Sequence, residues 1–504
     1  MTTIQKSAAS DRLASFLLSN GPALSSSAIE FLVSTGSTSA SARKVIQRSR
    51  GKVLRLVKIR FAHNQQFLFL AKQYKTPGFW QALIESFRST NSVYGYAVNS
   101  LLARDGAWPV PYFGIISGSP ERLSKHISSS TVLKKLTEIE LLELVDHPEI
   151  GPCAHVVEEA VAYPMPIGRA LRSRVIAEDI LLSGLKDWIR NTGFGSWNRV
   201  DVRNLRNQPK FGQFNWDFSA PTFVHPIRIP HNSQGSINGF IVGDVLLGRD
   251  IEVSDLEYFV LKADTMRSQR NTRPFLAVFV ADRYSNTALR AGRSKGLLLV
   301  TTETLFGSQV ASGLSQLIQV LNNAATAIGS NPALVSELFE KLDNLKGASL
   351  NVRGWLFELL AAHILKTDGW RIDFIGELRK DPQSGEIAEV DVLAVKGNDV
   401  IVLECKGYVT NDVAEHEVEK WLTRSIPRIR ASLLADQSYR KKDITFHFWT
   451  TSKFSHGALT YVNQKKMEIK KYSFSWTDGE FLMKYCTKIK SEYAIRILRE
   501  QYEL

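Results

Sequence analysis

The segment from residue 389 to residue 406 constrains the fold of this 504-residue chain more than any other. It consists of two apolar runs, rich in valine, isoleucine and leucine, on either side of a Lys-Gly-Asn-Asp tetrapeptide. Apolar runs of this kind around a Gly-Asn pair are typical of a β-hairpin with a two-residue loop. If Gly397 and Asn398 form that loop, the register places Asp391 directly opposite Glu404.

Two facing carboxylates on an otherwise apolar hairpin repel each other, because cross-strand Cβ atoms lie only about 4.5–5.5 Å apart. Such a pair needs a compensating cation. Strand alternation puts Lys406 on the same face as Glu404 and directs the Cys405 side chain into the core. Two carboxylates, a backbone carbonyl and water suit Mg²⁺, a hard ion that prefers oxygen ligands, with Mn²⁺ as an alternative. A lysine beside the ion can orient or deprotonate the attacking water.

These residues resemble the PD-(D/E)xK phosphodiesterase superfamily, which has the restriction-endonuclease-like fold. The matching positions are Asp391, the Glu-Cys-Lys triplet at 404–406, and Glu358 on a helix expected over Val352–Lys366. In that family the helix glutamate and the acid pair bind one or two divalent ions, and the lysine assists the attacking water. The resemblance therefore implies a catalytic set of Asp391, Glu404, Lys406 and Glu358, with metal ligands at Glu358, Asp391, Glu404 and Cys405.

The match covers roughly residues 350–475 and departs from the family pattern in two places. Val390 stands where the family name has proline. A Gln or Tyr is common on the helix after the triplet; it is not obvious here, and the candidates for its place are Glu417, Lys420 or Trp421. A bare Glu-x-Lys triplet carries little information, since residues 468–470 match it without an acid on a preceding strand. The alternative interpretation is an ordinary hairpin with a buried acid–lysine pair.

A comparison of the chain with itself indicates a second, earlier copy of this unit. Both copies have a glutamate-bearing helix that ends at glycine, then a β-run containing aspartate, then a β-run with a polar turn and Ala-Leu opening a helix. The three landmarks occur in the same order, so we expect a duplicated α/β unit with Asp244 lying over Asp391. The paired segments are Glu178 to Gly193 with Glu358 to Gly369, 243–247 with 390–394, and 279–289 with 449–459.

The first copy departs from the site of the second. Its residues 259–264 are expected to form a strand, which carries a lysine and an aspartate at the places of Glu404 and Lys406. Asp244 then lacks a carboxylate partner, and the metal site of this copy is expected to be lost. A degenerate copy of this kind can still hold nucleic acid or mediate dimerisation.

The first hundred residues are strongly basic, with 13 Lys and Arg against three Asp and Glu, so that +10 of the net charge of +13 lies there. A basic segment attracts polyanions, and nucleic acid is the commonest partner. Apolar residues at helical spacing predict three short helices in this segment, and two β-runs follow. The expected elements are helices over 11–20, 26–33 and 39–49 and strands over 53–59 and 67–70.

Three helices followed by a hairpin resemble a winged helix-turn-helix, whose third helix reads DNA. The alternative is a small helical domain that mediates protein contact. If the unit binds DNA, the donors expected to contact phosphates and base edges are Arg43, Lys44, Gln47, Arg48, Lys52, Arg55, Lys58 and Arg60.

The chain is longer than one hydrophobic core usually organises, so we predict a multidomain α/β protein. A winged helix-turn-helix is followed by two restriction-endonuclease-like domains, the first of them degenerate. A second helical or winged-helix-like unit lies between, with helices over 79–88, 94–104 and 131–145 and a strand near 112–116. The predicted boundaries are 1–75, 76–165 for this second unit, 166–306 for the degenerate copy, 307–348 for a helical connector and 349–504 for the nuclease.

Composition excludes several classes of protein. No apolar run approaches the roughly 20 residues that span a bilayer, so we expect no membrane segment. The polar N-terminus lacks the apolar core of a signal peptide. Three widely separated cysteines exclude a disulfide framework and suit a reducing, cytoplasmic location.

The sequence as a whole predicts a Mg²⁺-dependent endonuclease with DNA as the favoured substrate. Helix-turn-helix modules fused to this type of nuclease resemble bacterial restriction and anti-phage defence proteins, which implies partner proteins of such a system; a homodimer is also compatible with the sequence. Two rivals are a DNA-binding regulator or scaffold that keeps a vestigial nuclease fold, and an RNA-cleaving toxin.

Overall fold

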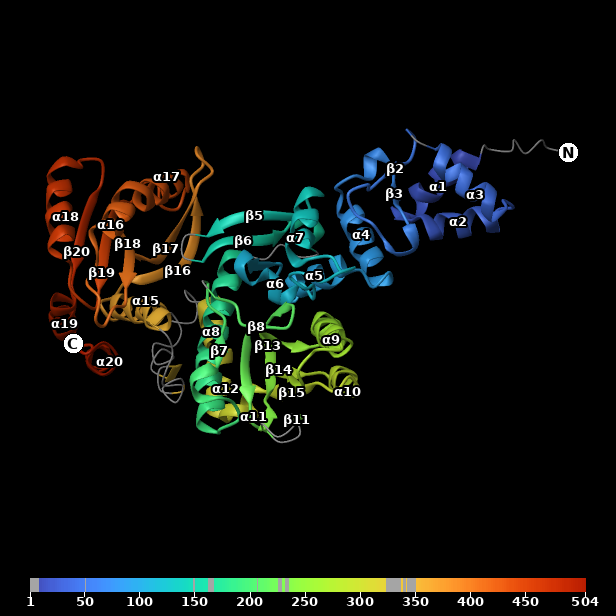
Figure 1. Cartoon of the computed structure of the whole chain (residues 1–504). Helices are drawn as coiled ribbons and strands as arrows, with labels where there is room; N and C mark the ends of the chain where they lie inside the picture. The colour runs from blue at the N-terminus through green and yellow to red at the C-terminus, as the bar shows by residue number, and fades with distance from the viewer. Residues whose placement is uncertain are drawn as a thin grey trace.

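The computed structural model describes residues 9–49, 51–147, 150–161, 167–205, 207–224, 229–231, 235–322, 337–338, 341 and 350–504. The chain is a mixed α/β protein with small sheets at the N-terminal end and two larger five-stranded sheets further on. The N-terminal unit and the last sheet lie at opposite ends of the molecule (Figure 1). Within the described ranges, no helix is long and apolar enough to cross a membrane.

The N-terminal unit contains the three predicted helices and the predicted strand pair, together with a short strand that the sequence analysis missed. Its strands are antiparallel in the order β1-β3-β2. The first strand of the predicted hairpin is much shorter than the apolar run that suggested it. The elements are α1 Ala9–Asn20, β1 Ala23–Leu24, α2 Ser25–Ser34, α3 Ser39–Arg48, β2 Leu54–Arg55 and β3 Phe67–Phe69.

The second unit repeats this sheet order, because its three strands are antiparallel in the order β4-β6-β5. The strand predicted near 112–116 was wrong, since those residues are helical. The helix predicted over 131–145 ends at Glu138: Glu140 adopts a φ of 63°, which reverses the chain into a strand. The elements are α4 Pro77–Ser89, α5 Val93–Leu102, β4 Ala107–Pro109, a 3₁₀ turn Val110–Tyr112, α6 Phe113–Ile116, α7 Ser129–Glu138, β5 Leu142–His147 and β6 Gly151–Val156.

The first copy of the α/β unit begins with a 25-residue helix, α8 Ile167–Asn191. Its sheet has the order β15-β14-β13-β10-β7, in which β7, β10 and β13 are antiparallel and β14 and β15 continue parallel to β13. Two small hairpins, β8–β9 and β11–β12, lie outside this sheet. The strands are β7 Asp201–Val202, β8 Lys210–Phe211, β9 Phe214–Asn215, β10 Phe218–Thr222, β11 Ile229–His231, β12 Gly235–Ile237, β13 Gly239–Ile251, β14 Phe275–Tyr284 and β15 Leu298–Thr301, and the later helices are α9 Val253–Arg267, α10 Asn286–Ser294, α11 Thr302–Phe306 and α12 Ser308–Asn322.

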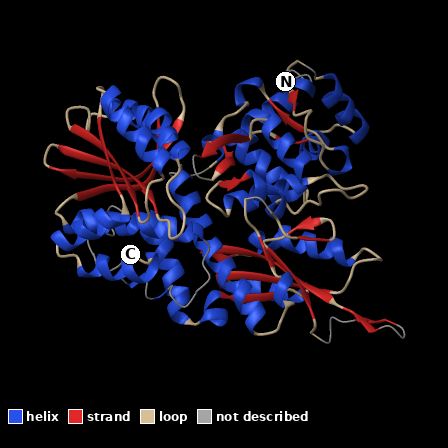
Figure 2. Ribbon diagram, turned by 60° about the vertical axis from the view of Figure 1, so that its left-hand side comes forward, coloured by secondary structure: helices blue, strands red, loops and turns tan. Residues whose placement is uncertain are grey.

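The second copy has the same plan, with a helix followed by the sheet order β16-β17-β18-β19-β20. Strands β16, β17 and β18 are antiparallel, and β19 and β20 continue parallel to β18. Helices cover both faces of each large sheet (Figure 2). The elements are α15 Leu350–Thr367, β16 Arg371–Lys380, β17 Ile387–Lys396, β18 Asp399–Lys406, α16 Glu415–Lys420, a π-helical turn Trp421–Ser425, α17 Ile426–Ala435, β19 Asp443–Thr450, α18 His456–Glu468, β20 Ser473–Thr477, α19 Gly479–Lys488 and α20 Glu492–Tyr502.

The shared topology supports the duplication inferred from the sequence, and the matching helix caps agree with it. The side chains of Ser285 and Ser455 each accept a hydrogen bond of 3.2 Å, from the backbone N–H of Ala288 and Ala458 respectively. One of the predicted alignments between the two copies was wrong. Residues 243–247 lie on the third strand, β13, whereas residues 390–394 lie on the second strand, β17.

The strand predicted over 259–264 was also wrong, because those residues belong to helix α9. Each copy therefore places its glutamate-bearing helix first and an acidic residue on its third strand. Asp244 on β13 corresponds to Glu404 on β18 and does not correspond to Asp391.

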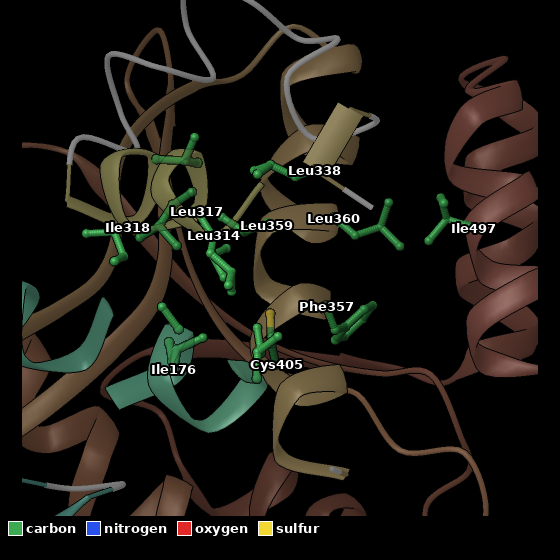
Figure 3. Close-up of a cluster of buried hydrophobic side chains, with 14 of the residues drawn as sticks. Ile176, Leu314, Leu317, Ile318, Leu338, Phe357, Leu359, Leu360, Cys405 and Ile497 are labelled. Atoms are coloured by element: carbon green, nitrogen blue, oxygen red, sulfur yellow. The ribbon is translucent and has the colours of Figure 1, made fainter. Parts of the chain in front are cut away.

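The two copies share one hydrophobic core, so they are not independent bodies. Buried side chains of α8, α12, α15 and α20 form one continuous cluster with the inner face of both sheets. Figure 3 shows Ile176, Leu314, Phe357 and Ile497 of these four helices in that cluster. The predicted connector over 307–348 thus begins with a helix that packs on α8. Most of the predicted connector beyond this helix falls outside the described residues.

A pair of histidines is buried in the hairpin of the second unit. The Nε2 atoms of His147 and His155 lie 2.8 Å apart, and their rings stack with centroids 4.9 Å apart. Burial is the main cause that lowers the pKa of both imidazoles to about 4. For His155, the neighbouring His147 also contributes to this lowering of the pKa. One ring must donate the hydrogen bond and the other accept it, so the folded pair is stable only while the rings are neutral.

We expect this pair to make the stability of the protein fall in acid. Each folded pKa of about 4 lies below the unfolded value of about 6.5, so the stabilisation is complete above pH 6.5 and is lost as the pH falls to 4. The loss amounts to at most about 3 kcal/mol per histidine. Urea titrations between pH 7 and 4 should show a smaller loss for His147→Phe/His155→Phe than for the wild type. Replacement of the exposed His416 by Phe is the control, and it should retain the full loss.

Candidate functional site

The β17–β18 hairpin has the register that the sequence predicted. Lys396 pairs with Asp399 across the Gly397-Asn398 loop, and the pairing continues to Val392 and Leu403. Gly397 has a φ of 64°, a conformation that glycine adopts without strain. If this register is continued by one residue beyond Val392 and Leu403, it places Asp391 opposite Glu404.

Three of the four predicted catalytic side chains, those of Asp391, Glu404 and Lys406, lie around the Cys405 backbone. The Cys405 backbone N–H donates a 2.6 Å hydrogen bond to Asp391 Oδ2, and Lys406 Nζ lies 3.0 Å from Glu404 Oε1. Burial raises the pKa of the Cys405 thiol well above its usual value; Asp391, Glu358 and Glu404 raise it further, and Lys406 opposes them. All four charged groups therefore act on the same buried point, and the Cys405 side chain stays a neutral thiol.

The two halves of this cluster differ in exposure. Asp391 is 2% exposed, whereas the side chains of Glu404 and Lys406 are 18% and 20% exposed. The acid that is fixed to the backbone is thus closed off, and the acid–lysine pair beside it reaches the surface. This arrangement leaves the Glu404 and Lys406 end of the cluster partly exposed to solvent.

The helix glutamate has an ionic partner that the sequence analysis missed. Glu358 on α15 is 2% exposed, and its carboxylate contacts the guanidinium group of Arg172, which belongs to α8 of the first copy. Arg172 Nε also lies 2.7 Å from Glu389 Oε1 on β17. A Cβ atom at Gly376 would collide with this arginine, so the glycine on β16 makes room for it. The sequence could have indicated Glu389, because it lies two residues before Asp391 on the same strand. Nothing in the sequence around Arg172 indicates that this residue contacts the site.

The donor set of the second copy fits a divalent cation through oxygen atoms. Asp391 and Glu404 offer two neighbouring carboxylates, and the Cys405 backbone offers a carbonyl between them. Across the described residues, no group of three or more His, Cys, Asp or Glu side chains is close enough to share a metal ion. The predicted three-carboxylate set is therefore not assembled, because Glu358 is engaged with Arg172.

The first copy repeats the hydrogen bonds of this site on its own strands. Asp217 Oδ2 accepts a 2.8 Å hydrogen bond from the Val245 backbone N–H, as Asp391 accepts one from Cys405. Asp217 therefore corresponds to Asp391 and faces Asp244 across β10 and β13. The expectation that Asp244 lacks a carboxylate partner was wrong, because the sequence alignment of the two copies was shifted by one strand.

Cationic side chains contact the helix glutamate and both acids of the first copy. Arg203 joins the helix glutamate to the first acid, with Nη2 2.7 Å from Glu178 Oε2 and Nε 2.6 Å from Asp217 Oδ1. Lys262 Nζ, on α9, lies 2.6 Å from Asp244 Oδ2. Arg104 of the second unit donates a 3.1 Å hydrogen bond to the Val245 carbonyl, the equivalent of the Cys405 carbonyl.

This ion network is sealed from solvent, and its pKa shifts reflect that burial. Glu178, Asp244 and Lys262 are fully buried, and Asp217 is 1% exposed. Burial raises the pKa of Glu178 and of Asp244 and lowers the pKa of Lys262, because each charged form is costly away from water. A site with its cations built in and no opening has no place for a metal or a substrate.

The three residues expected to replace the family's helix Gln or Tyr have other roles. Glu417 accepts hydrogen bonds from the Tyr408 hydroxyl and from the Ala414 backbone N–H, and so caps α16. Lys420 is exposed, and Trp421 is buried in the core of the outer sheet face. The control triplet at 468–470 lies on the surface at the end of α18, away from any acid pair.

The exposed face of α3 carries four of the eight side chains predicted to bind DNA, Arg43, Lys44, Gln47 and Arg48, and the other four follow this helix in the chain. Ala42 and Ile46 are buried against α1 and α2, which turns the polar face outward. Arg55 is an exception, because its Nη2 donates a hydrogen bond to the Ile46 carbonyl and so holds the end of α3. Lys52 pairs with Asp11, and Lys58 donates to the backbone of the second unit. The exposed predicted donors are Arg43, Lys44, Gln47, Arg48, Lys52, Lys58 and Arg60.

Comparison of the chain with models of protein families, with curated proteins and with solved structures gave no match. The chain instead offers an internal comparison: two copies of one fold have acids at equivalent places, and these are sealed by cations in one copy and partly exposed in the other.

Replacing the central cation of the closed network should destabilise the protein strongly. Arg203→Met leaves buried carboxylates without their cation, so the free energy of unfolding should fall by about 3–5 kcal/mol in urea titrations. Arg283→Met is the matched control, since Arg283 Nε also lies 2.6 Å from a carboxylate, that of Asp250, but on the surface. Little change is expected for the control, and equal effects of the two substitutions would contradict the role assigned to Arg203.

The exposed face of α3 should govern the salt dependence of DNA binding. Changing Arg43, Lys44 and Arg48 together to alanine should weaken duplex binding and reduce the slope of log K against log salt by up to about 3, because fewer counterions are released. The control replaces the exposed Lys484, Lys488 and Lys490, which removes the same charge elsewhere. Fluorescence anisotropy at several salt concentrations measures both; equal slopes for the two triple variants would assign the N-terminal unit to protein contact.

Proposed function

We propose that this chain is a metal-dependent nuclease that hydrolyses phosphodiester bonds, most favourably in DNA, with its active site in residues 350–504. The observation that carries the proposal is the partly open cluster in which Asp391 is fixed by the Cys405 N–H beside Glu404, and Glu404 holds Lys406 at 3.0 Å. An acid pair with a lysine is the combination that binds a hard cation and prepares a water for attack.

The residues of the cluster have distinct tasks in this proposal. When bound, a divalent ion such as Mg²⁺ or Mn²⁺ would polarise the scissile phosphate and lower the pKa of a coordinated water. Asp391 and Glu404 would hold the ion, with Asp391 kept in place by its backbone hydrogen bond. Lys406 stands beside Glu404 at the solvent-facing end, where its ammonium group would donate a hydrogen bond that orients the attacking water.

The first copy serves as a structural partner in this proposal and has no catalytic role. Its equivalent acids are satisfied by Arg203 and Lys262 and are closed to solvent. It shares its core with the second copy through α8 and α12, so it supports the catalytic domain directly.

We assign DNA binding to the N-terminal unit as a winged helix-turn-helix. The order of three helices and three strands and the exposed basic face of α3 support this assignment. The second unit has the same sheet order but the opposite charge, with six Lys and Arg against ten Asp and Glu over residues 76–165, compared with 12 against two over residues 1–75. The second unit is therefore assigned to protein contact inside the chain, and a role in bacterial restriction or anti-phage defence follows from the fusion of these two modules.

The direct test is incubation of the purified chain with linear, circular and single-stranded DNA and with RNA, in Mg²⁺, Mn²⁺ or EDTA. Cleavage of DNA that requires a divalent ion is the expected result. Cleavage confined to RNA would favour a toxin. A chain inactive on every substrate with every ion would leave a DNA-binding scaffold with a vestigial fold.

Two substitutions should abolish cleavage by different routes. Asp391→Ala removes a carboxylate that would hold the ion, so Mn²⁺ affinity measured by calorimetry should fall together with the rate. Lys406→Ala keeps both carboxylates, so the rate should fall by about 10²-fold or more while Mn²⁺ still binds. The matched controls are Glu468→Ala and Lys470→Ala in the surface triplet, which should leave both measurements unchanged. Equal Mn²⁺ affinities for the wild type and Asp391→Ala would contradict the proposed site.

A further inference from the structure

We infer that the first copy binds single-stranded nucleic acid in a basic, aromatic-walled cavity on its surface. The cavity has a volume of about 670 Å³ and lies between the β8–β9 hairpin, the start of β13 and the chain that follows helix α9. A space of this size accommodates a ligand as large as a nucleotide. The inference does not rest on the proposed nuclease, because it concerns another place in the fold and requires no cleavage.

The hairpin that forms one wall of this cavity has no counterpart in the second copy. Residues 203–217 join β7 to β10 and contain β8 and β9, whereas residues 381–386 join the corresponding strands β16 and β17 by a turn. Gly212, between β8 and β9, has a φ of 62°, and a Cβ atom there would meet the side chain of Met266 on α9. The hairpin therefore packs closely on α9, and the cavity is a feature of the first copy.

The charged side chains that line the cavity are all cationic. They are Lys210, Arg270 and Arg273, and the described lining contains no Asp or Glu. Lys210 Nζ lies 2.9 Å from Glu121 Oε2 in an exposed ion pair. Arg270 and Arg273 are exposed and have no carboxylate partner among the described residues. Two guanidinium groups without a carboxylate favour the phosphate groups of a ligand.

One wall of the cavity is aromatic. Phe211 and Phe240 line it with their ring centroids 4.7 Å apart, and Phe275 lies 5.4 Å from Phe211. Phe211 is buried, whereas Phe240 is half-buried and offers ring surface to a ligand. The Arg273 guanidinium carbon lies 5.9 Å from the centroid of Phe240. A base stacked on Phe240 would thus have a cation beside it for its phosphate, and any of the bases can stack in this way.

A shielded amide at the cavity lacks a hydrogen-bond acceptor. Gln269 lines the cavity, and its Nε2 atom is closed off from bulk solvent and donates to no described residue. Shielded donors in folded proteins are almost always satisfied. The oxygen and nitrogen atoms of a base edge are acceptors of the kind that this amide lacks, and the amides of Gln213 and Asn271 line the same space.

These features fit a single strand better than a duplex. The bases of a duplex are stacked on one another, so their faces cannot reach Phe240, and only the exposed arginines would remain in contact. In a single strand a base can leave the stack and enter the cavity while its phosphates contact Arg270 and Arg273. The first copy, whose acids are closed off, would hold the strand without cleaving it.

The test measures the binding of a fluorescent oligothymidylate and of a duplex of the same length by anisotropy, in EDTA. The full chain carries Arg43→Ala, Lys44→Ala and Arg48→Ala, so that α3 contributes little to either measurement. Adding Arg270→Gln/Arg273→Gln should weaken binding of the single strand by about tenfold or more. It should also reduce the slope of log K against log salt by about 1.4, because two phosphate contacts are lost, and it should leave duplex binding unchanged.

Phe240→Leu tests the aromatic wall separately from the charge. It keeps an apolar side chain but removes the ring, so binding of the single strand should weaken by about fivefold or more, with the salt slope unchanged. The arginine pair lies on the surface, so its variant keeps the inference testable if a Tm measurement shows that Phe240→Leu does not fold.

The matched control is Arg290→Gln/Arg293→Gln, which removes the same charge from exposed positions of α10 in the same copy. It should leave binding of the single strand unchanged. Equal losses for the two arginine pairs would assign the binding to general surface charge, and equal losses for single strand and duplex would mean that no base enters the cavity. An oligothymidylate that does not bind, with or without binding of thymidine monophosphate, is the third result that overturns the inference. None of these results bears on the proposed nuclease, which is tested by cleavage.

Discussion

Helix α8 and the arginine near its start hold the folded chain together. In a single helix of 25 residues, about 37 Å long, Leu171 and Val175 enter the core of the second unit, and Arg172 reaches the carboxylates of Glu358 and Glu389 in the second copy. The following turns carry Glu178 into the ion network of the first copy and supply apolar side chains to the shared core. A buried ion pair contributes modestly to stability but is costly to break, so this helix fixes the relative positions of three units.

The two copies share one backbone topology, but they differ in the cationic side chains that contact their acidic residues. In the first copy Arg203, Lys262 and Arg104 satisfy both acids, the helix glutamate and the backbone carbonyl, and the site is closed. In the second copy Lys406 contacts Glu404 from the same strand, and Asp391 accepts a hydrogen bond from the Cys405 backbone N–H. The acids of the first copy are thus closed off together with their cations, whereas the acid–lysine pair of the second copy reaches the surface.

The two N-terminal units also share a strand order but differ in the charge of their surfaces. Both have three antiparallel strands with the third strand at the centre, yet one unit is strongly basic and the other is acidic. A fold of this kind presents a helix and a hairpin, and the charge on them selects the partner. In the first unit the basic face is exposed on α3; in the second, the hairpin strand β5 contacts β17 of the second copy.

The sequence by itself determined the features that depend on neighbouring residues. Strand alternation and the Gly-Asn loop gave the register that brings Asp391 to Glu404 and Lys406, and spacing gave the helices of the N-terminal unit. Tertiary structure decided what depends on distant residues. The pairing of the two copies was shifted because Asp217 lies outside any recognisable pattern, and the helix α9 was taken for a strand because a short apolar run fits both. Arg172 meets Glu358 across 186 positions of sequence, and only the packing of α8 against α15 could reveal that contact.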